Sequence, residues 1–320
     1  MQPRSAHAPT PSDLTHLRAS NPLGAAVLAG SGSLTVASVL LSTRPQWWLW
    51  LAGQLLLAFS LVQWFSILHE CGHETLFRTR RFHAIAGQVA GFFSLIPFFT
   101  WKSVHGRQHK WTVWQDVDPT TETLVPRELK TVERLLVNAC WRYWIPLFSV
   151  MYRVNNFWNW PRLESLFKNA KDRRGIALNS LGLLVAYAAI VIAVGPTVLL
   201  RIAGLGVLLS LIAEDLLLLS QHTHIPQQLS HGEPVRPFPT IEQEVFTRSL
   251  VSPAWLSAVL LHIDAHELHH MYPFVPGYRL GGIHYETENE IDVWTWIRRA
   301  RAMPGEIFLF HNRLETGADF

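Results

Sequence analysis

Two stretches of this chain lack charged residues over lengths that match the thickness of a lipid bilayer. Residues 45–68 contain no Asp, Glu, Lys or Arg over 24 positions, and residues 176–200 contain none over 25. As a helix, either stretch is long enough to cross a hydrocarbon core of about 30 Å. Charged residues make up only 16% of the chain, against about a quarter in soluble domains. The sequence therefore predicts an integral membrane protein.

Two further apolar runs predict a second helix beside each of these stretches. Residues 22–43 are uncharged but rich in Gly and Ser, and residues 202–219 carry only Glu214 and Asp215 as charged groups. Short turns would join the runs in pairs. We therefore expect an all-α fold with four transmembrane helices in two hairpins. The expected spans are about 22–43, 46–68, 176–195 and 198–220.

The distribution of basic residues predicts the orientation in the membrane. Of the 27 Lys and Arg residues, only Arg44 and Arg201 lie on the side opposite to all the others. Because Lys and Arg accumulate in cytoplasmic loops, we expect both termini and a helical cap to be cytoplasmic. The expected layout is an N-terminal cytoplasmic segment, 1–21, followed by a single membrane domain, 22–320, whose cytoplasmic parts are 69–175 and 221–320.

Composition excludes several other classes of protein. The chain has two cysteines, too few for a disulfide scaffold or for a [2Fe–2S] cluster held by this chain alone. The net charge of +3 reflects the cytoplasmic bias of Lys and Arg, and no block of basic residues or nucleic-acid-binding motif stands out. We therefore expect no nucleic-acid partner.

Histidine is frequent, at 16 residues, and nine of the histidines occur in four short clusters. The clusters are His69 and His73; His105 and His109; His222 and His224; and His266, His269 and His270. Histidines four residues apart lie on one face of a helix, so that both can reach one metal ion. Because two spans separate the second cluster from the third, all four clusters would lie on the same side of the membrane.

The number of these histidines predicts a site for two metal ions. A single histidine pair is usually an ordinary surface or core feature, but four clusters on one membrane face indicate a metal centre. Structural zinc takes four ligands and catalytic zinc three, so nine imidazoles exceed the needs of one ion. Imidazole binds Zn, Cu, Fe and Ni, so the ligands alone do not name the metal. His222 and His224 are two apart and cannot share a helix face.

One motif predicts a different chemistry. The segment from His69 to His73, with Glu70 between them, satisfies the H-E-x-x-H pattern of zinc proteases, in which the glutamate acts as the base. An intramembrane zinc metalloprotease is therefore an alternative function. That alternative leaves three of the four histidine clusters without a role.

The residues around the clusters resemble a known family. His-Glu-Cys-Gly-His occupies 69–73, Pro-Phe-Phe-Thr-Trp-Lys-Ser-Val-His occupies 97–105, Gln-His-Thr-His occupies 221–224, and His-Glu-Leu-His-His occupies 266–270. Together these segments resemble the histidine boxes of the membrane fatty acid desaturases, and look most similar to the plant-type oleate desaturase branch. The resemblance extends from about Gln63 to Tyr278.

The resemblance implies an oxidoreductase with two iron ions (Fe2+/Fe3+) that uses O2 and two electrons to desaturate a fatty acyl chain at the cytoplasmic membrane face. The nine histidines of the four clusters would hold the iron. The acyl substrate would be linked to lipid, CoA or a carrier protein, and membrane lipid would surround the spans. Electrons would come from a separate donor such as ferredoxin or cytochrome b5, because these residues include no haem module or [2Fe–2S] cysteine set.

The second box departs from the family pattern H-x-x-H-H, because Gln108 stands where relatives have a histidine. The same scaffold supports hydroxylases, acetylenases and alkene-forming decarboxylases, which are alternative activities. Four residues are expected to contact and orient the metal ligands without binding the metal themselves. They are Gln108, His262, Glu214 and Asp215. His262 lies four residues before His266, and we expect both on one helix that ends at Pro273.

Overall fold

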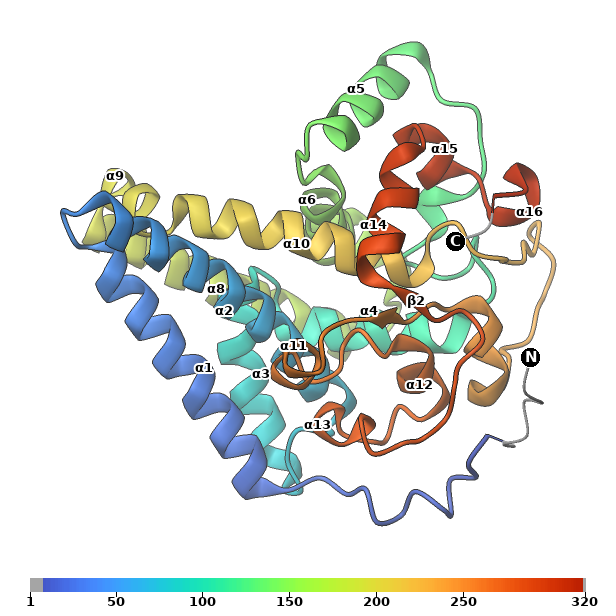
Figure 1. Ribbon diagram of the computed structural model, residues 1–320, viewed down its shortest axis with the longest axis horizontal. Helices are drawn as coiled ribbons and strands as arrows, with labels where there is room; N and C mark the ends of the chain where they lie inside the picture. The colour runs from blue at the N-terminus through green and yellow to red at the C-terminus, as the bar shows by residue number, and fades with distance from the viewer. Residues whose placement is uncertain (1–7, 319–320) are drawn as a thin grey trace.

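The structure is a computed structural model that describes residues 8–318 (Figure 1). It is built almost entirely of helices. The α-helices are α1 (Asn21–Ser42), α2 (Trp47–His73), α3 (Arg80–Ser94), α4 (Phe98–Trp111), α5 (Thr131–Arg142), α6 (Leu147–Arg153), α7 (Trp160–Leu166), α8 (Ala170–Val194), α9 (Pro196–Leu199), α10 (Leu205–His222), α11 (Ala254–Val259), α12 (His266–Met271), α13 (Gly277–Leu280), α14 (Val293–Ala302), α15 (Gly305–Phe310) and α16 (Arg313–Thr316). Short 3-10 helices lie at η1 (Glu122–Leu124) and η4 (Thr240–Phe246), and π-helical segments at η2 (Val154–Trp158) and η3 (Leu200–Gly204).

Four helical segments are long and apolar enough to cross a membrane, as expected. They are Asn21–Ser42, Trp47–His73, Ala170–Val194 and Pro196–His222, the last built from α9, η3 and α10. The second and fourth segments extend past the predicted spans and carry His69, His73 and His222 within their final turns. The prediction of an all-α membrane fold with four spans is confirmed.

Small residues allow α1 and α2 to pack closely. A Cβ atom on Gly53 of α2 would lie 2.5 Å from the Ser42 hydroxyl of α1, so only glycine fits there. Hydroxyl groups also join the two helices, since Thr35 and Ser60 hydrogen-bond at 2.7 Å and Trp64 donates to Thr35. The Gly and Ser content of the first span is therefore a packing feature of this helix pair.

The chain turns sharply between α3 and α4, before the second pair of histidines. Helices α3 and α4 are bent by 94° to each other, and the break follows Leu95, whose φ is +59°. Helix α4 then carries His105 and His109, four residues apart, on one face. The bend returns the chain to the end of α2, where the first histidine pair lies (Figure 1).

A continuous helix from His262 to Pro273 is contradicted, because α12 contains only His266–Met271. Leu261 and His262 have φ values of +57° and +50°, which interrupt any helix. The segment makes a tertiary contact in place of a helical hydrogen bond. The backbone oxygen of Ile263 accepts a hydrogen bond from the Gln221 side chain on α10. The interruption therefore anchors the third box to the end of the fourth span.

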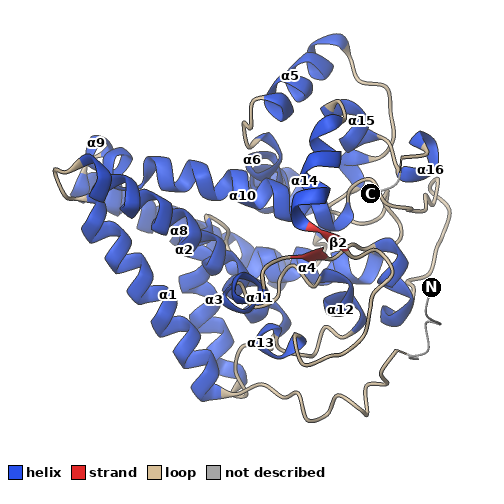
Figure 2. Ribbon diagram, in the orientation of Figure 1, coloured by secondary structure: helices blue, strands red, loops and turns tan. Residues whose placement is uncertain are grey.

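The last third of the chain covers the ends of the membrane-length helices with short helices and one small sheet (Figure 2). Strands β1 (Leu250–Val251) and β2 (Ile291–Asp292) pair in parallel. Arg248 donates hydrogen bonds to the backbone oxygens of Ser220, Thr223 and His224, which secures the chain where α10 ends. The backbone N–H of the next residue, Ser249, donates to Glu267, so this segment joins the end of α10 to α12.

Candidate metal centre

Eight of the nine predicted histidines come together in two groups of possible ligands. Within each group, one ring nitrogen from every member lies within 4.8 Å of the others. The first group, called here the five-histidine group, is His69, His73, His105, His109 and His269. The second, the three-histidine group, is His222, His266 and His270. The structure therefore divides the histidine clusters between two positions. The histidines of α2 and α4 belong to the five-histidine group, His222 of α10 belongs to the three-histidine group, and α12 contributes to both.

The ring nitrogens approach one another in a way that fits bound cations. The Nε2 atom of His105 lies 2.7 Å from Nε2 of His73 and 3.2 Å from Nε2 of His109. In the other group, Nε2 of His266 lies 2.8 Å from Nε2 of His222 and 3.1 Å from that of His270. In a neutral imidazole, each ring nitrogen has either one N–H or one lone pair. A nitrogen with two such contacts therefore cannot make an ordinary hydrogen bond to both neighbours. Two ligand nitrogens about 2.1 Å from one ion at a right angle lie about 3 Å apart, which matches these distances.

The histidines of α12 are held in the neutral form that binds metal. His266, His269 and His270 are all buried. Burial, with the neighbouring imidazoles, holds the pKa of each of these three rings well below its usual range. Metal binding to these rings therefore needs no loss of a proton at neutral pH.

Gln243 of η4 orients His270, and no local sequence pattern pointed to this residue. Its amide nitrogen donates to the backbone oxygen of His109, so its amide oxygen faces the Nδ1 atom of His270 at 2.8 Å. Since a carbonyl oxygen only accepts, Nδ1 carries the ring proton and Nε2 keeps its lone pair. Hydrogen bonds of this kind set the tautomer of a metal-binding histidine.

Glu70, the base in the protease pattern, is a buried structural carboxylate. Its Oε2 atom accepts hydrogen bonds from the Thr75 hydroxyl at 2.7 Å and from the backbone N–H of Gly277 at 2.8 Å. Its Oε1 atom lies 3.5 Å from Nδ1 of His69. These contacts tie the first box to the segment after the third box and support the orientation of His69.

His224 lies outside both groups. It lies just after the end of α10 and has a φ of +57°. Its Nδ1 atom lies 3.1 Å from the backbone oxygen of His311, and its Nε2 atom 2.8 Å from the Thr316 hydroxyl. Both ring nitrogens are thus engaged with the C-terminal segment, so the structure does not bring this predicted ligand to the others.

Three of the four residues expected to support the metal ligands, Glu214, Asp215 and His262, hydrogen-bond to partners other than the ligand histidines. Glu214 forms a buried ion pair with Arg153 of α6, and Asp215 accepts from the backbone N–H of Ser149. The Nδ1 atom of His262 lies 2.9 Å from the backbone oxygen of Gly277. Within residues 8–318, no hydrogen bond joins any of them to a ligand histidine. Glu214 and Asp215 instead fasten α6 to the fourth span.

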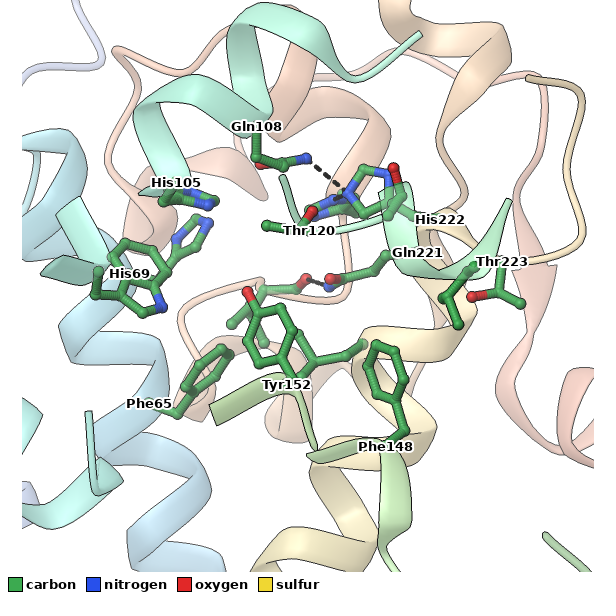
Figure 3. A pocket seen from close by; sticks show the side chains of 16 residues that line it. Phe65, His69, His105, Gln108, Thr120, Phe148, Tyr152, Gln221, His222 and Thr223 are labelled. Carbon is green, nitrogen blue, oxygen red and sulfur yellow. Dashed lines mark hydrogen bonds between the residues drawn. The ribbon is translucent and has the colours of Figure 1, made fainter. Parts of the chain in front are cut away.

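Gln108, which the sequence places in the second box, lies beside the three-histidine group. Its side chain is buried, and its amide nitrogen lies 2.9 Å from Nε2 of His222 and 3.3 Å from Nε2 of His270. Figure 3 shows the amide directed at His222.

Both groups border one small cavity, which shares lining residues with a larger and mostly apolar cavity. The small cavity, about 40 Å³, is lined by His69 and His105 from one group and by His222 and His266 from the other (Figure 3). A second cavity, about 330 Å³, lies between α5, α6 and the end of α10. The residues shared by both cavities are Thr120, Leu124, Phe148 and Tyr152.

Four membrane-length helices, together with two histidine groups beside a mostly apolar cavity, define a membrane protein with a candidate two-metal centre. Comparison with known families identifies it further: residues 45–294 match the fatty acid desaturase family. The chain therefore belongs to the fatty acid desaturase family.

The relatives of this chain include desaturases from bacteria and plants. It is 29% identical over 177 residues to the sn-1 oleoyl-lipid 12-desaturase of Picosynechococcus sp., which covers 52% of this chain and 48% of that protein. It is 26% identical over 252 residues to a fatty acid desaturase of Bacillus subtilis, covering 78% of this chain and 71% of that protein. A chloroplastic omega-3 fatty acid desaturase of Glycine max is 24% identical over 270 residues, covering 77% of this chain and 55% of that protein. The match to the first of these thus spans about half of its length.

Proposed function

We propose that this protein is an O2-dependent di-iron oxidoreductase that desaturates a fatty acyl chain at the cytoplasmic face of the membrane. The observation that carries the proposal is the pair of adjacent histidine groups bordering one cavity in a chain of the desaturase family. Two iron ions, when bound, would supply the activation of O2 needed to remove hydrogen from an unactivated C–H bond.

The larger cavity supports an acyl substrate. Its volume of about 330 Å³ falls in the range of small-molecule sites, about 300–1,000 Å³. Leu136, Ile145 and Met151 line it and are also about half exposed, so its entrance is apolar. The charged side chains Arg127 and Glu133 at the same cavity pair with each other. An apolar entrance on helices fastened to the fourth span favours entry of a hydrocarbon chain from the membrane.

The residues between the two cavities would align the chain with the metal centre. Phe148 and Tyr152 of α6 border both cavities, and Tyr152 stacks edge-on against the buried ring of Phe157. Trp101 stacks on His105 with ring centroids 4.1 Å apart and helps to keep water from that side of the centre. These groups bind and orient an apolar chain, and they offer no charge to it.

The zinc protease is a weaker explanation of the same residues. Glu70 would have to act as a base on a bound water, but its carboxylate is buried and already accepts hydrogen bonds from Thr75 and Gly277. His69 and His73 also belong to a group of five histidines, more than catalytic zinc uses. Both observations favour the two-metal centre.

Lipid analysis of an expressing host tests the proposed reaction. We expect new acyl chains lighter by two hydrogens, because desaturation removes two and adds nothing. A hydroxylase would instead give chains heavier by one oxygen. Supplying reduced ferredoxin or cytochrome b5 to isolated membranes would identify the donor. Unchanged lipids from cells that contain iron-loaded protein, with either donor present, would contradict the proposal.

Cysteine labelling tests the proposed orientation. Arg44, Glu128 and Glu288 are exposed, and the two native cysteines, Cys71 and Cys140, are buried. With a membrane-impermeant reagent, single cysteines at Glu128 and Glu288 should be labelled only from the cytoplasmic side. A cysteine at Arg44 should be labelled only from the opposite side. Labelling of positions 128 and 288 from different sides would contradict a shared cytoplasmic centre.

A further inference from the structure

The two histidine groups are unequal, and a neutral amide lies where the smaller one lacks a ligand. One position has five histidines and the other three. The amide group of Gln108 lies 2.9 Å and 3.3 Å from the Nε2 atoms of His222 and His270. These distances equal the spacing of about 3 Å expected between two ligand atoms on one ion. The amide therefore occupies the place of a fourth ligand in the three-histidine group.

The proton on His270 determines which amide atom belongs at that place. Because Gln243 accepts from Nδ1 of His270, the Nε2 atom of His270 presents a lone pair toward Gln108. A cation bound by these lone pairs would repel an amide NH2 group and attract an amide oxygen. With a metal ion present, the oxygen of Gln108 should thus face the histidines.

The hydrogen bonds of the Gln108 side chain are consistent with a rotation of the amide that brings its oxygen toward the histidines. Its buried Oε1 atom has no hydrogen-bond partner among residues 8–318, while Nε2 lies 2.9 Å from Nε2 of His222 and 3.2 Å from the Thr112 hydroxyl. A half-turn of the amide exchanges the oxygen and the NH2 group with little change in shape. The adjoining cavity of about 40 Å³ has room for a water molecule that would accept from the NH2 group.

We propose that Gln108 is a metal ligand, which binds through its amide oxygen the ion held by His222, His266 and His270. This inference rests on the two-metal centre of the proposed function, and not on the identity of the reaction. It replaces the supporting role expected from the sequence. The two ions then have different protein ligands. One is held by histidine nitrogens alone, and the other by three histidine nitrogens and one amide oxygen.

Iron content and Mössbauer spectra of the purified, 57Fe-loaded protein test the inference without measuring activity. The wild-type protein should bind about two irons and show two unequal components, because the ligand sets differ. Gln108→Ala should weaken the binding of one iron by more than about 100-fold in a chelator titration, beyond the loss of 10–100-fold typical of a supporting group. Gln108→His should keep both irons and make the two components more alike.

Thr112→Val is the matched control. Thr112 is buried and its hydroxyl contacts the Gln108 amide, so this variant removes a neighbour of the amide while leaving its oxygen free to bind. It should keep both irons and the wild-type spectrum. Thermal unfolding of the metal-free variants would show whether any iron loss comes from misfolding.

The outcomes separate the two proposals. Fewer than two irons in folded wild-type protein would overturn the two-metal centre together with this inference. Two irons in the wild type, with the same two irons and the same spectrum in Gln108→Ala, would overturn the ligand role of Gln108 alone. Loss of one component in Gln108→Ala and its recovery in Gln108→His would establish it.

Discussion

Replacing His266 by alanine is expected to remove one metal ion and to abolish the oxidation of acyl chains. His266 is the central member of the three-histidine group, since its Nε2 atom contacts both His222 and His270. Without it, only two imidazoles remain beside Gln108, which is fewer nitrogen ligands than the three histidines that hold this position in the wild type. Iron should fall from about two to about one per chain, and activity by more than about 100-fold, since even supporting groups cost 10–100-fold.

His224→Ala is the control for this variant, because His224 lies in the same neighbourhood but outside both groups. Its ring contacts His311 and Thr316, so its removal loosens the C-terminal segment and not the metal centre. Iron analysis and lipid mass spectrometry of both variants check the prediction. Equal iron loss from His224→Ala and His266→Ala would show that the grouping of the histidines is wrong.

Replacing Arg153 by alanine is expected to destabilise the protein by about 3–5 kcal/mol, the cost of leaving a buried charge unpaired. Arg153 pairs with Glu214, and the side chains are only 7% and 1% exposed. The guanidinium also donates to the backbone oxygens of Ser94 and Ser149, so it joins α3, α6 and α10. The free energy of unfolding in detergent, measured with denaturant, checks this value.

An exposed ion pair provides the comparison. Arg173 pairs with Glu164, and their side chains are 34% and 53% exposed. Because exposed pairs contribute about 0–1 kcal/mol, Arg173→Ala should change the free energy of unfolding very little. A loss for Arg153→Ala no larger than that for Arg173→Ala would contradict the prediction that the buried pair matters more for stability than the exposed one.

The membrane spans and the histidine pairs could be predicted because both are properties of local sequence. A run of about 20 apolar residues must form a helix in lipid, where backbone groups have no water to bind. The i, i+4 spacing of His69 and His73 places both on one helix face, wherever that helix lies. The even number of spans between the boxes then places them on one side of the membrane.

Local spacing misled the prediction where tertiary contacts control the backbone. The pattern of His262, His266, His269 and His270 fits one helix face, but Leu261 and His262 have positive φ. Hydrogen bonds from Gln221 and to Gly277 hold this segment out of a helix. A rule based on local spacing cannot predict these contacts, because they join residues that are distant in the sequence.

The sequence by itself determined that this chain is a four-span membrane protein of the desaturase type with histidines in clusters, because hydrophobic length and helical period act over a few residues. Only the tertiary structure decided how the histidines divide into groups of five and three, that His224 stays outside, and that Gln243 sets the proton of His270. Each of these depends on helices brought together from positions as far apart as residues 69 and 270. Their relative placement comes from packing and buried hydrogen bonds, and no single segment of the chain encodes it.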